Sequence, residues 1–380
     1  MFRQSRRTIH VLRDQPTPSL ERLSKRARLL PSSPIELETS SSSRILSFPP
    51  SHALSSWSAP PRTLLLVQKP DDSRVRSTME SVLSHLTTRY PHLRLIVEPH
   101  TARDHPEFHD LTVVEKEDRA LLGLHTELIL TLGGDGTVLH VSNLFGQGEC
   151  PPVLCFSMGS LGFLLPFHID SLAEALHTTL TGPVPVLNRM RLACTPVSAS
   201  GEVLDRCSDM IVGDAGWQVM NEVTLHRGGQ RPLVVVDAYF DGQHLTEAVA
   251  DGLLLSTPTG STAYSLAAGG PISHPETDAF LLTPIAPRSL SFRTVILPGR
   301  GVVKLQVSDR SRAPAELLVD GREICMLHSG ESVIIAKSPF PIPCIERSEG
   351  GNSWVRDINS LLQFNVGFRN KSLAPGGSGD

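Results

Sequence analysis

The residues with the clearest capacity for chemistry lie in one short run, Gly133-Gly134-Asp135-Gly136-Thr137. Three glycines surround one carboxylate, and glycine lets the backbone approach a ligand closely. The run follows an apolar segment, Glu127 to Leu130, and its free backbone N–H groups at a helix start form a cradle for anions. A carboxylate there repels a phosphate. It predicts a catalytic base or an acid linked to a metal ion, although an N-cap in a tight strand-to-helix turn is the alternative.

Two other segments place small or polar residues where strands begin or end. Residues 156–164 follow an apolar strand, and the glycines Gly159 and Gly162 permit close approach of the backbone to a ligand or a loop. Simple turn chemistry would explain this segment equally well. Asn221 and Glu222 together offer donors, acceptors and a charge, which suits a purine edge or a ribose diol, and a surface strand start is the alternative.

The longest candidate segment runs from Asp251 to Ser265. A buried strand leads into small and hydroxyl residues, and Tyr264 follows them. Hydroxyl and backbone N–H groups in such a turn hold phosphate or ribose oxygens, and a tyrosine ring stacks on a planar ring. A Ser/Thr-rich loop without a ligand is the alternative, but the low charge and the apolar segment that follows, Leu266 to Gly269, favour a binding site.

Alternating strands and helices must position the first of these segments. Apolar runs predict strands over residues 63–67, 94–98, 127–132 and 153–156, and helical spacing predicts an amphipathic helix over residues 72–89. This order is typical of a parallel sheet with crossover helices. Ligands bind such sheets beyond the carboxyl ends of the strands, which is where the glycine run lies.

Short β-rich runs follow from about Pro185 and predict an all-β domain. Asp241-Gly242 and Asp320-Gly321 are dipeptides of tight hairpin turns. The predicted fold is therefore an α/β N-terminal domain with a parallel sheet plus an all-β C-terminal domain. The expected strands of the second domain cover residues 191–197, 221–226, 233–240, 253–256, 294–297, 302–307, 317–319 and 333–336.

The two ends of the chain differ from its centre. Residues 1–28 are rich in arginine and contain only Asp14 and Glu21 as acidic residues, and serine and proline dominate up to about Pro61. This composition is typical of a mitochondrial transit peptide, and an extension without a targeting role, in a cytoplasmic protein, is the alternative. We expect a disordered leader over 1–60, the α/β domain over 61–187, the β-rich domain over 188–345, and a segment over 346–380 that packs back and ends in a disordered tail.

The composition is that of an ordinary globular protein. Of the 380 residues 19% are charged and 40% hydrophobic, and the formal net charge of −4 gives no indication of a nucleic-acid partner. No apolar run approaches the length of a membrane span, about 20 residues. The six cysteines form no C-x-x-C pair, which argues against a structural zinc site, and we expect them to be buried reduced thiols.

Taken together, the four segments resemble the NAD kinase family. The combination of G-G-D-G-T with D-G-L-x-x-S-T-P-T-G-S-T-A-Y, and with Asn-Glu between them, is highly specific, whereas G-G-D-G alone also occurs in lipid kinases and phosphofructokinases. The runs from Arg288 to Arg293 and from Val319 to Glu323 match as well. The resemblance covers about residues 62–345. It implies an α/β N-terminal domain with a parallel sheet and an all-β, sandwich-like C-terminal domain, with the active site in the cleft between them. The leader and the run around Arg288 are most similar to the fungal mitochondrial NADH kinase branch.

The resemblance implies roles for the glycine run and its helix. Asp135 matches the catalytic aspartate, and Gly136 matches a contact to the dinucleotide beside it. His140 occupies a position that is often basic and near the substrate. The other residues of the run implied in binding are Gly133, Gly134 and Thr137.

Further binding residues are implied in the β-rich, NAD-binding domain. Asn221 and Glu222 match the pair that holds the nicotinamide-side ribose or the adenine. Asp251 matches an acid that contacts the substrate across a subunit interface. The turn implied in binding comprises Thr259, Gly260, Ser261 and the four residues matched to the adenosine site, Thr262, Ala263, Tyr264 and Ser265.

The implied reaction moves the γ-phosphoryl group of ATP to the adenosine 2′-hydroxyl of NAD⁺ or NADH, with Asp135 accepting the hydroxyl proton and Mg²⁺ or Mn²⁺ accompanying ATP. The family further implies a homodimer or homotetramer. Two alternatives are a lipid kinase of the diacylglycerol or sphingosine type, which shares G-G-D-G-T, and a dinucleotide sensor without catalysis.

Overall fold

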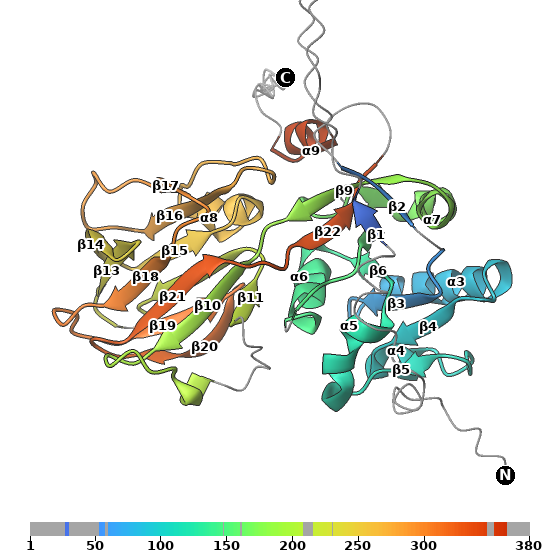
Figure 1. Ribbon diagram of the computed structural model, residues 1–380, viewed down its shortest axis with the longest axis horizontal. Coiled ribbons are helices and arrows are strands. Elements are labelled where there is room, and N and C mark those ends of the chain that lie inside the picture. The colour runs from blue at the N-terminus through green and yellow to red at the C-terminus, as the bar shows by residue number, and fades with distance from the viewer. Residues whose placement is uncertain are drawn as a thin grey trace, which may run out of the picture.

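Two lobes lie side by side, an α/β lobe and a lobe made mainly of strands (Figure 1). The chain runs from the α/β lobe into the strand lobe after residue 189 and returns to it before residue 342. The computed structural model of the chain describes residues 27–29, 53–57, 60–146, 148–159, 162–207, 216–229, 231–347 and 353–362.

A sheet of ten strands, counted over the described residues, forms the centre of the α/β lobe. Its strands from β22 through β7, β6, β3 and β4 to β5 run parallel, as predicted, and β8 pairs in parallel with β7. On the other side of β22 the strands β9, β2 and β1 pair in antiparallel fashion. The strands are β1 Ala27–Leu29, β2 Ala53–Trp57, β3 Thr63–Gln68, β4 Arg94–Val97, β5 Thr112–Val113, β6 Leu128–Gly133, β7 Val153–Ser157, β8 Phe167–His168, β9 Val184–Arg189 and β22 Ile342–Ile345.

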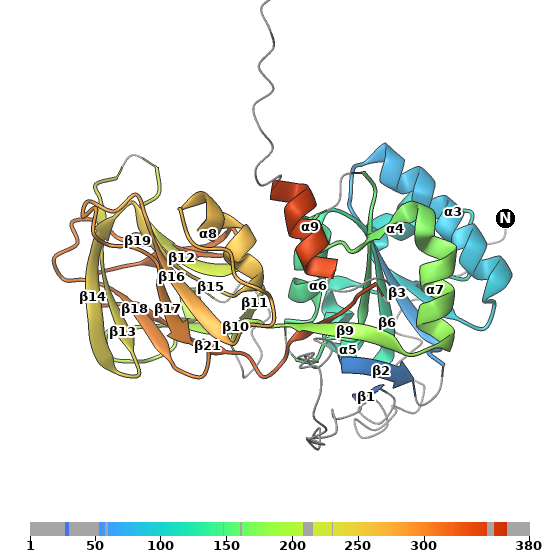
Figure 2. The same cartoon turned by 90° about the horizontal axis from the view of Figure 1, so that it is seen from above.

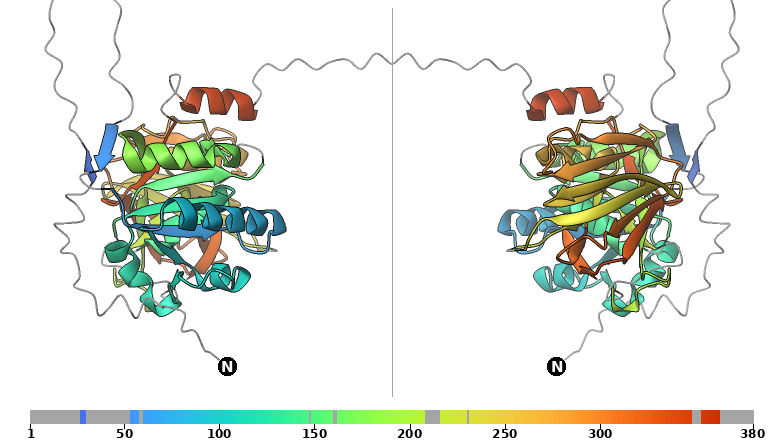
Figure 3. Two further views of the ribbon diagram at one scale, coloured as in Figure 1. Left: turned by 90° about the vertical axis from the view of Figure 1, so that its right-hand side faces the viewer. Right: turned by 90° about the vertical axis from the view of Figure 1, so that its left-hand side faces the viewer.

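Helices cover both faces of this sheet. Leu64 and Leu66 on β3 pack in the core with α3 and α7, whereas Leu65 and Val67 pack on the other face with α6. Side chains alternate between the two faces of a strand, so a strand covered on both faces reads as a continuous apolar run. Figure 3 shows α3 and α7 together over one face. The helices are α3 Ser73–Arg89, α4 Pro99–Asp104, α5 Leu122–His125, α6 Asp135–Leu144 and α7 Leu172–Thr181, with 3₁₀ turns η1 Lys116–Leu121 and η2 Ile169–Ser171.

The second lobe consists of two antiparallel sheets whose facing apolar side chains form one core. The predicted hairpin turns are confirmed, because Asp241-Gly242 joins β13 to β14 and Asp320-Gly321 joins β19 to β20. One sheet has the order β11 (Trp217–Val219), β10 (Leu192–Val197), β21 (Ser332–Lys337), β18 (Val303–Val307), β13 (Val234–Phe240), β14 (Gln243–Ala250). The other has the order β17 (Val295–Pro298), β16 (Ala279–Ile285), β15 (Gly252–Ser256), β12 (Glu222–His226), β19 (Ala315–Val319), β20 (Arg322–Leu327). Short helical segments are η3 Asp205–Cys207, η4 Thr259–Thr262 and α8 Tyr264–Ala267.

The cysteines depart from the prediction in one respect. Cys207 and Cys325 form a disulfide, so the expectation of a reduced thiol is wrong for these two residues. They are 118 positions apart in the sequence, and only the packing of η3 beside β20 brings their Cα atoms to 5.5 Å. The other four cysteines are free and buried, as expected.

The chain ends contribute further elements. The strands β1 and β2 lie within the segment for which no regular structure is expected, and β2 extends the sheet beside β9. A helix near the C-terminus, α9 (Ser353–Leu362), lies over the junction of the two lobes (Figure 2). The tail predicted beyond Ala374 and most of the predicted leader fall outside the described residues. No helix in the described part of the chain is long and apolar enough to cross a membrane.

Candidate active site

Asp135 begins α6 directly after the carboxyl end of β6, at the sheet edge predicted for the site. Its carboxylate accepts the backbone N–H of Leu164 at 3.1 Å and that of Phe163 at 3.3 Å. The cap position of the helix is Gly134, so the N-cap alternative for Asp135 is wrong. The carboxylate is therefore held by a neighbouring loop and remains half-exposed at the end of the helix.

The glycines around Asp135 serve two different needs. A Cβ at Gly133 would lie 2.2 Å from Oγ1 of Thr137, and a Cβ at Gly162 would lie 2.3 Å from Oδ1 of Asp135, so both positions require glycine. By contrast, a Cβ at Gly134 or Gly136 would meet no atom within 4 Å. The backbone beside the helix start thus faces open space, as an anion-binding helix N-terminus requires.

The surroundings of Asp135 act on its protonation. Burial raises the pKa of the Asp135 carboxyl above its ordinary value, and the N–H groups of Leu164 and Phe163 and the charge of Arg189 act in the opposite direction. A carboxyl that binds its proton more firmly than usual is a stronger base once ionised.

His140 lies on α6 but is engaged elsewhere. Its Nε2 lies 2.9 Å and 3.0 Å from the two carboxylate oxygens of Glu98. Although burial acts to raise the pKa of Glu98, the bond to His140 and the nearby Arg119 side chain hold it below its ordinary value. The imidazole therefore has a partner within the α/β lobe.

Asn221 and Glu222 lie at the start of β12 and are fixed by Asp320 in the β19–β20 turn. The Asp320 carboxylate accepts the backbone N–H groups of Met220, Asn221 and Glu222 at 3.0, 2.7 and 3.2 Å. Glu222 is 4% exposed, and its Oε2 has no hydrogen-bond partner in the described structure. Burial raises the pKa of Glu222 to about 8, the Asp320 carboxylate adds to this rise, and the Tyr264 N–H opposes it. A buried acceptor without a partner is what a ligand hydroxyl would satisfy.

The hydroxyl-rich segment folds against Asn221. The Thr257 hydroxyl donates to the Met220 carbonyl at 2.6 Å and accepts the Gly260 N–H at 2.9 Å. A Cβ at Gly260 would lie 2.3 Å from the Asn221 carbonyl oxygen, which requires glycine there. The 3₁₀ turn η4 and the short helix α8 therefore sit directly beside the Asn–Glu pair.

Several hydroxyls of this segment have internal partners. Ser261 exchanges bonds with the backbone of Ser273, Ser265 bonds to Thr283, and Thr262 donates to the Thr259 carbonyl. Thr259, Gly260, Ser261 and Ser265 are buried, Thr262 and Ala263 are half-buried, and Tyr264 is exposed. The groups of this segment that face solvent are thus concentrated at residues 262–264.

Asp251 pairs with Arg227 and acts on the nearby Tyr264. Its carboxylate forms an ion pair with Nε of Arg227 at 2.5 Å. Burial raises the pKa of the Tyr264 phenol, and the charges of Asp251 and Glu222 act in the same direction. Asp251 and Glu222, from two of the predicted segments, therefore both act electrostatically on the Tyr264 phenol.

The two halves of the site meet at α6. Met220, which precedes Asn221, packs in the same core cluster as Val138 and Val141 of α6. The buried guanidinium of Arg191 donates to the carbonyls of Ser142 and Phe145 at the end of this helix, at 3.2 and 3.1 Å. The helix that begins with Asp135 is thus anchored to the start of the second lobe.

Comparison with known proteins decides the family. The model of the ATP-NAD kinase N-terminal domain matches residues 64–184, and that of the C-terminal domain matches residues 220–347. The mitochondrial NADH kinase pos5 of Schizosaccharomyces pombe is 40% identical over 83% of this chain and 78% of its own length. The chain belongs to the NAD kinase family.

Other members agree in sequence and fold. The mitochondrial NADH kinase POS5 of Saccharomyces cerevisiae is 33% identical over 88% of this chain and 89% of its own. The crystal structure of yeast NADH kinase with NADH superposes with a TM-score of 0.75 at 33% identity, covering 83% of this chain and 92% of that one. An Archaeoglobus fulgidus NAD kinase in complex with ATP has a TM-score of 0.56 at 18% identity, covers 79% of this chain and 98% of its own, and supports the fold alone.

In this NAD kinase, sequence reasoning missed the residues that hold the predicted ones. The sequence indicates Asp320 as a hairpin-turn residue within a run that matches the family, but not that it fixes three backbone groups around the Asn–Glu pair. Phe163 and Leu164 hold Asp135 through backbone N–H groups, which carry no side-chain signal. Glu98 and Arg189 gave no signal, because their importance comes only from the neighbours that the fold provides.

Proposed function

We propose that the chain is an NAD(H) kinase that transfers the γ-phosphoryl group of ATP to the adenosine 2′-hydroxyl of NAD⁺ or NADH. The observation that carries this proposal is the position of Asp135 at the open N-terminus of α6, oriented by the N–H groups of Phe163 and Leu164. The family membership supplies the substrate class, and the geometry supplies the base.

Asp135 is proposed as the acceptor of the hydroxyl proton. A ribose hydroxyl is a weak nucleophile near neutral pH, so it needs a base as its bond to phosphorus forms. The backbone N–H groups of the helix N-terminus, beside Gly134 and Gly136, attract the phosphate oxygens and place the donor in line. One element thus holds both the base and the group that is transferred.

Magnesium enters as part of the ATP substrate. No cluster of three or more metal-binding side chains occurs among the residues that the structure describes. The divalent ion, Mg²⁺ or Mn²⁺, neutralises charge on the triphosphate, while the chain contributes backbone donors and Asp135.

The second lobe is proposed to hold the dinucleotide. Glu222 has an unpartnered carboxylate oxygen that a ribose hydroxyl can satisfy, and Asn221 lies beside it. Tyr264 is exposed and offers its ring for stacking, and Thr262 and Ala263 beside it are half-buried. Asp251, paired with Arg227, remains proposed as an acid that reaches the substrate of a neighbouring subunit in a homodimer or homotetramer.

The substrate redox state and the cellular location follow from the relatives. Two relatives carry the name mitochondrial NADH kinase, and a solved relative holds NADH. We therefore propose NADH as the preferred acceptor, ATP as the donor and the mitochondrial matrix as the location. The leader is proposed to end near residue 60, and the lobes are proposed as domains over 61–187 and 188–345, followed by the segment 346–380.

Initial rates with the purified full chain test the proposal. NADP⁺ or NADPH formation is measured with NAD⁺ and NADH side by side, with Mg–ATP or polyphosphate as donor. The proposal expects product with Mg–ATP and a higher kcat/KM for NADH, and absence of product with both dinucleotides would contradict it. A reporter fused to residues 1–60 tests the location, and a cytosolic signal would refute matrix targeting.

A further inference from the structure

A buried ion pair lies beneath the loop that holds Asp135. Arg189, the last residue of β9, and Glu346, directly after β22, have side chains that are each 5% exposed, and Nη2 lies 3.6 Å from Oε1. Arg189 faces Ile342 in the antiparallel register and Leu187 faces Cys344, so Arg189 and Glu346 lie on the same face of the two strands. Their long side chains meet along this face.

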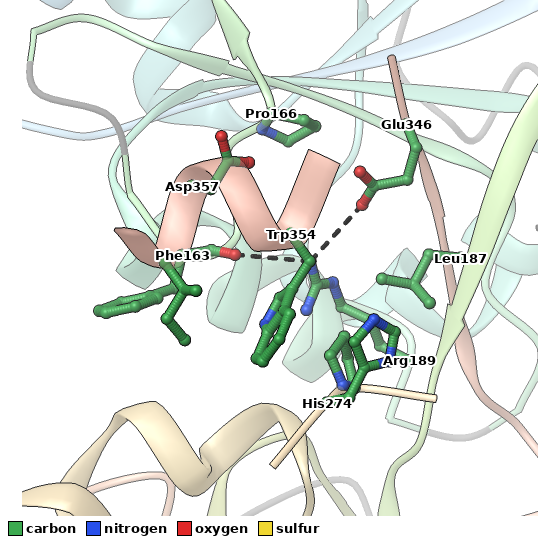
Figure 4. A pocket seen from close by; sticks show the side chains of 10 residues that line it. Phe163, Pro166, Leu187, Arg189, His274, Glu346, Trp354 and Asp357 are labelled. Carbon is green, nitrogen blue, oxygen red and sulfur yellow. Dashed lines mark hydrogen bonds and ion pairs between the residues drawn. The ribbon is translucent and has the colours of Figure 1, made fainter. Parts of the chain in front are cut away.

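The guanidinium also contacts the loop. Nη2 of Arg189 donates to the carbonyl of Phe163 at 3.5 Å, and the N–H of the same peptide unit, that of Leu164, donates to Asp135 at 3.1 Å. This Phe163 peptide joins Phe163 to Leu164. Figure 4 shows Arg189 between Glu346 and Phe163, in a pocket that His274 and Trp354 also line. A continuous series of polar contacts therefore joins Glu346, Arg189, the Phe163 peptide and Asp135.

Stability alone does not account for this pair. The free-energy cost of removing two charges from water can exceed the attraction between them, above all across a long contact. Replacing a buried ion pair by apolar residues is therefore often neutral or stabilising. Nε of Arg189 has no hydrogen-bond partner within the described part of the chain, so the guanidinium is not saturated by a structural network. Its polar contacts include Glu346, the loop beside Asp135 and the buried Cys344 thiol.

We propose that Arg189 and Glu346 are a positioning pair that holds the Phe163 peptide against Asp135 and supplies a balanced charge beneath it. The inference rests on the proposed role of Asp135 as the base. Arg189 supplies the positive charge and the contact to the loop, and Glu346 holds the guanidinium in place and offsets its charge. Neither residue is assigned contact with a substrate.

Replacing either member of the pair changes the net charge near Asp135 and should therefore change the pKa of its carboxyl. Asp135 must be ionised to accept a proton, so activity falls as the pH drops through its pKa. Arg189→Met removes a positive charge and leaves the Glu346 carboxylate, which raises the pKa of Asp135. The acid limb of the pH–activity profile, in which activity falls as the pH drops, then moves to higher pH. Glu346→Gln leaves Arg189 uncompensated, which lowers that pKa and moves the limb to lower pH.

Other ionisable groups nearby are the same in every variant. Lys69 follows β3 beside Gly133 and pairs with Asp72, and His140 on α6 contacts Glu98. The other groups are His274 after α8, Asp357 on α9 with its partner Arg347, and the buried thiols of Cys155 on β7 and Cys344 on β22. Because none of them is replaced, a difference between the two variants reports the pair itself.

The test measures kcat/KM for NADH against pH in the full chain and in Arg189→Met, Arg189→Lys and Glu346→Gln. We expect Arg189→Met and Glu346→Gln to shift the acid limb in opposite directions, each by roughly half a pH unit or more. Arg189→Lys keeps the charge but loses the planar fork, so its kcat should fall while the limb stays in place. Asp278→Asn, which removes one carboxylate from an exposed pair with Lys337, serves as the control and should leave the limb unmoved.

The proposal would be overturned if Arg189→Met and Glu346→Gln shifted the acid limb in the same direction. It would also be overturned if both variants lowered the rate and left the acid limb unmoved, which would indicate a purely structural role for the pair. If Arg189→Met does not fold, Glu346→Gln and Arg189→Lys still test the proposal. It predicts a shifted acid limb in Glu346→Gln and an unshifted acid limb in Arg189→Lys. The base role is judged separately by Asp135→Asn. Loss of turnover in that variant, combined with no opposed shifts here, would reject the positioning pair alone.

Discussion

The carboxylate of Asp135 and the backbone of Gly162 lie so close that a Cβ at position 162 would come within 2.3 Å of Oδ1. The next two residues of the same loop, Phe163 and Leu164, donate their N–H groups to this carboxylate. The loop therefore fits over the acid with no room for a side chain, and the orientation of Asp135 depends on that fit.

Gly162→Ala should displace the Asp135 carboxylate, because the added methyl group occupies its place. We expect kcat to fall by about 100-fold, the order of loss that follows from a misplaced catalytic group. Gly159→Ala is the matched control in the same segment, since a Cβ there meets nothing within 4 Å. Equal rates for both variants, measured as NADPH formation, would show that the loop does not position the acid.

Glu222→Gln should stabilise the free protein increasingly as the pH rises. Burial raises the pKa of Glu222 from 4.5 to about 8 in the folded chain, so the folded state binds the proton more tightly than the unfolded state. The free energy of unfolding of the wild type therefore falls as the pH rises from about 4.5 to about 8, and glutamine removes this loss. Thermal unfolding at pH 5 and pH 8 should show a gain on the order of 1–4 kcal/mol at pH 8 and little at pH 5. A gain that does not change with pH would contradict the shifted pKa.

Asp320→Asn should weaken dinucleotide binding more than it slows the chemical step. The amide can replace only part of the three N–H contacts that the carboxylate accepts, so the start of β12 loosens. A loss of about 1–3 kcal/mol corresponds to a rise of roughly 5-fold to 150-fold in KM for NADH. Asp241→Asn is the control, because Asp241 has a similar turn conformation, with φ 49° against 46°, and accepts only the Val302 N–H. A similar KM for the two variants would remove Asp320 from the site.

Arg191→Met should destabilise the whole molecule. The guanidinium is fully buried and donates to four carbonyl groups, and burial lowers its pKa to about 10, so it stays charged near neutral pH. Removing these donors leaves buried acceptors unpaired, and the free energy of unfolding should fall by roughly 3–5 kcal/mol.

The control for Arg191 is Arg231→Met, which breaks a partly exposed pair with Glu316. We expect a loss below about 1 kcal/mol for this surface pair. Denaturant unfolding measures both variants, and comparable losses would show that the Arg191 contacts add little.

The sequence was sufficient for the elements with strong local signals. The apolar run after Arg62 and the helical spacing up to Arg89 correspond to β3 and α3, and the two Asp-Gly dipeptides form the expected turns. The position of Asp135 at a strand's carboxyl end also followed from the order of strands and helices. These features depend on side chains that are neighbours along the chain.

Three of the strands outside the predicted ranges, β9, β16 and β22, contain a proline, at positions 185, 284 and 343. Proline has no N–H to donate, so it weakens a strand pattern. It does not remove the pattern, because β10 contains Pro196 and matches the strand predicted over 191–197. The structure tolerates these prolines inside the sheets, and β22 returns the chain to the first sheet after the second lobe is complete.

The supporting residues of the site could not be predicted, because they act across large distances in sequence. Asp320 lies 98 positions after Glu222, and the Arg189 side chain meets Glu346 only because β22 returns beside β9. Neither pair has a spacing or a pattern that indicates the contact. Only the folded chain shows which polar groups support Asp135.

The most direct test of the central claim is the turnover of Asp135→Asn with NADH and Mg–ATP, measured together with the dissociation constant for NADH. Asparagine retains an oxygen for the N–H groups of Leu164 and Phe163 but cannot take up the hydroxyl proton. We predict that kcat falls by roughly 1,000-fold or more while the dissociation constant changes by less than about threefold. A variant that retains near-normal turnover would contradict the assignment of Asp135 as the base.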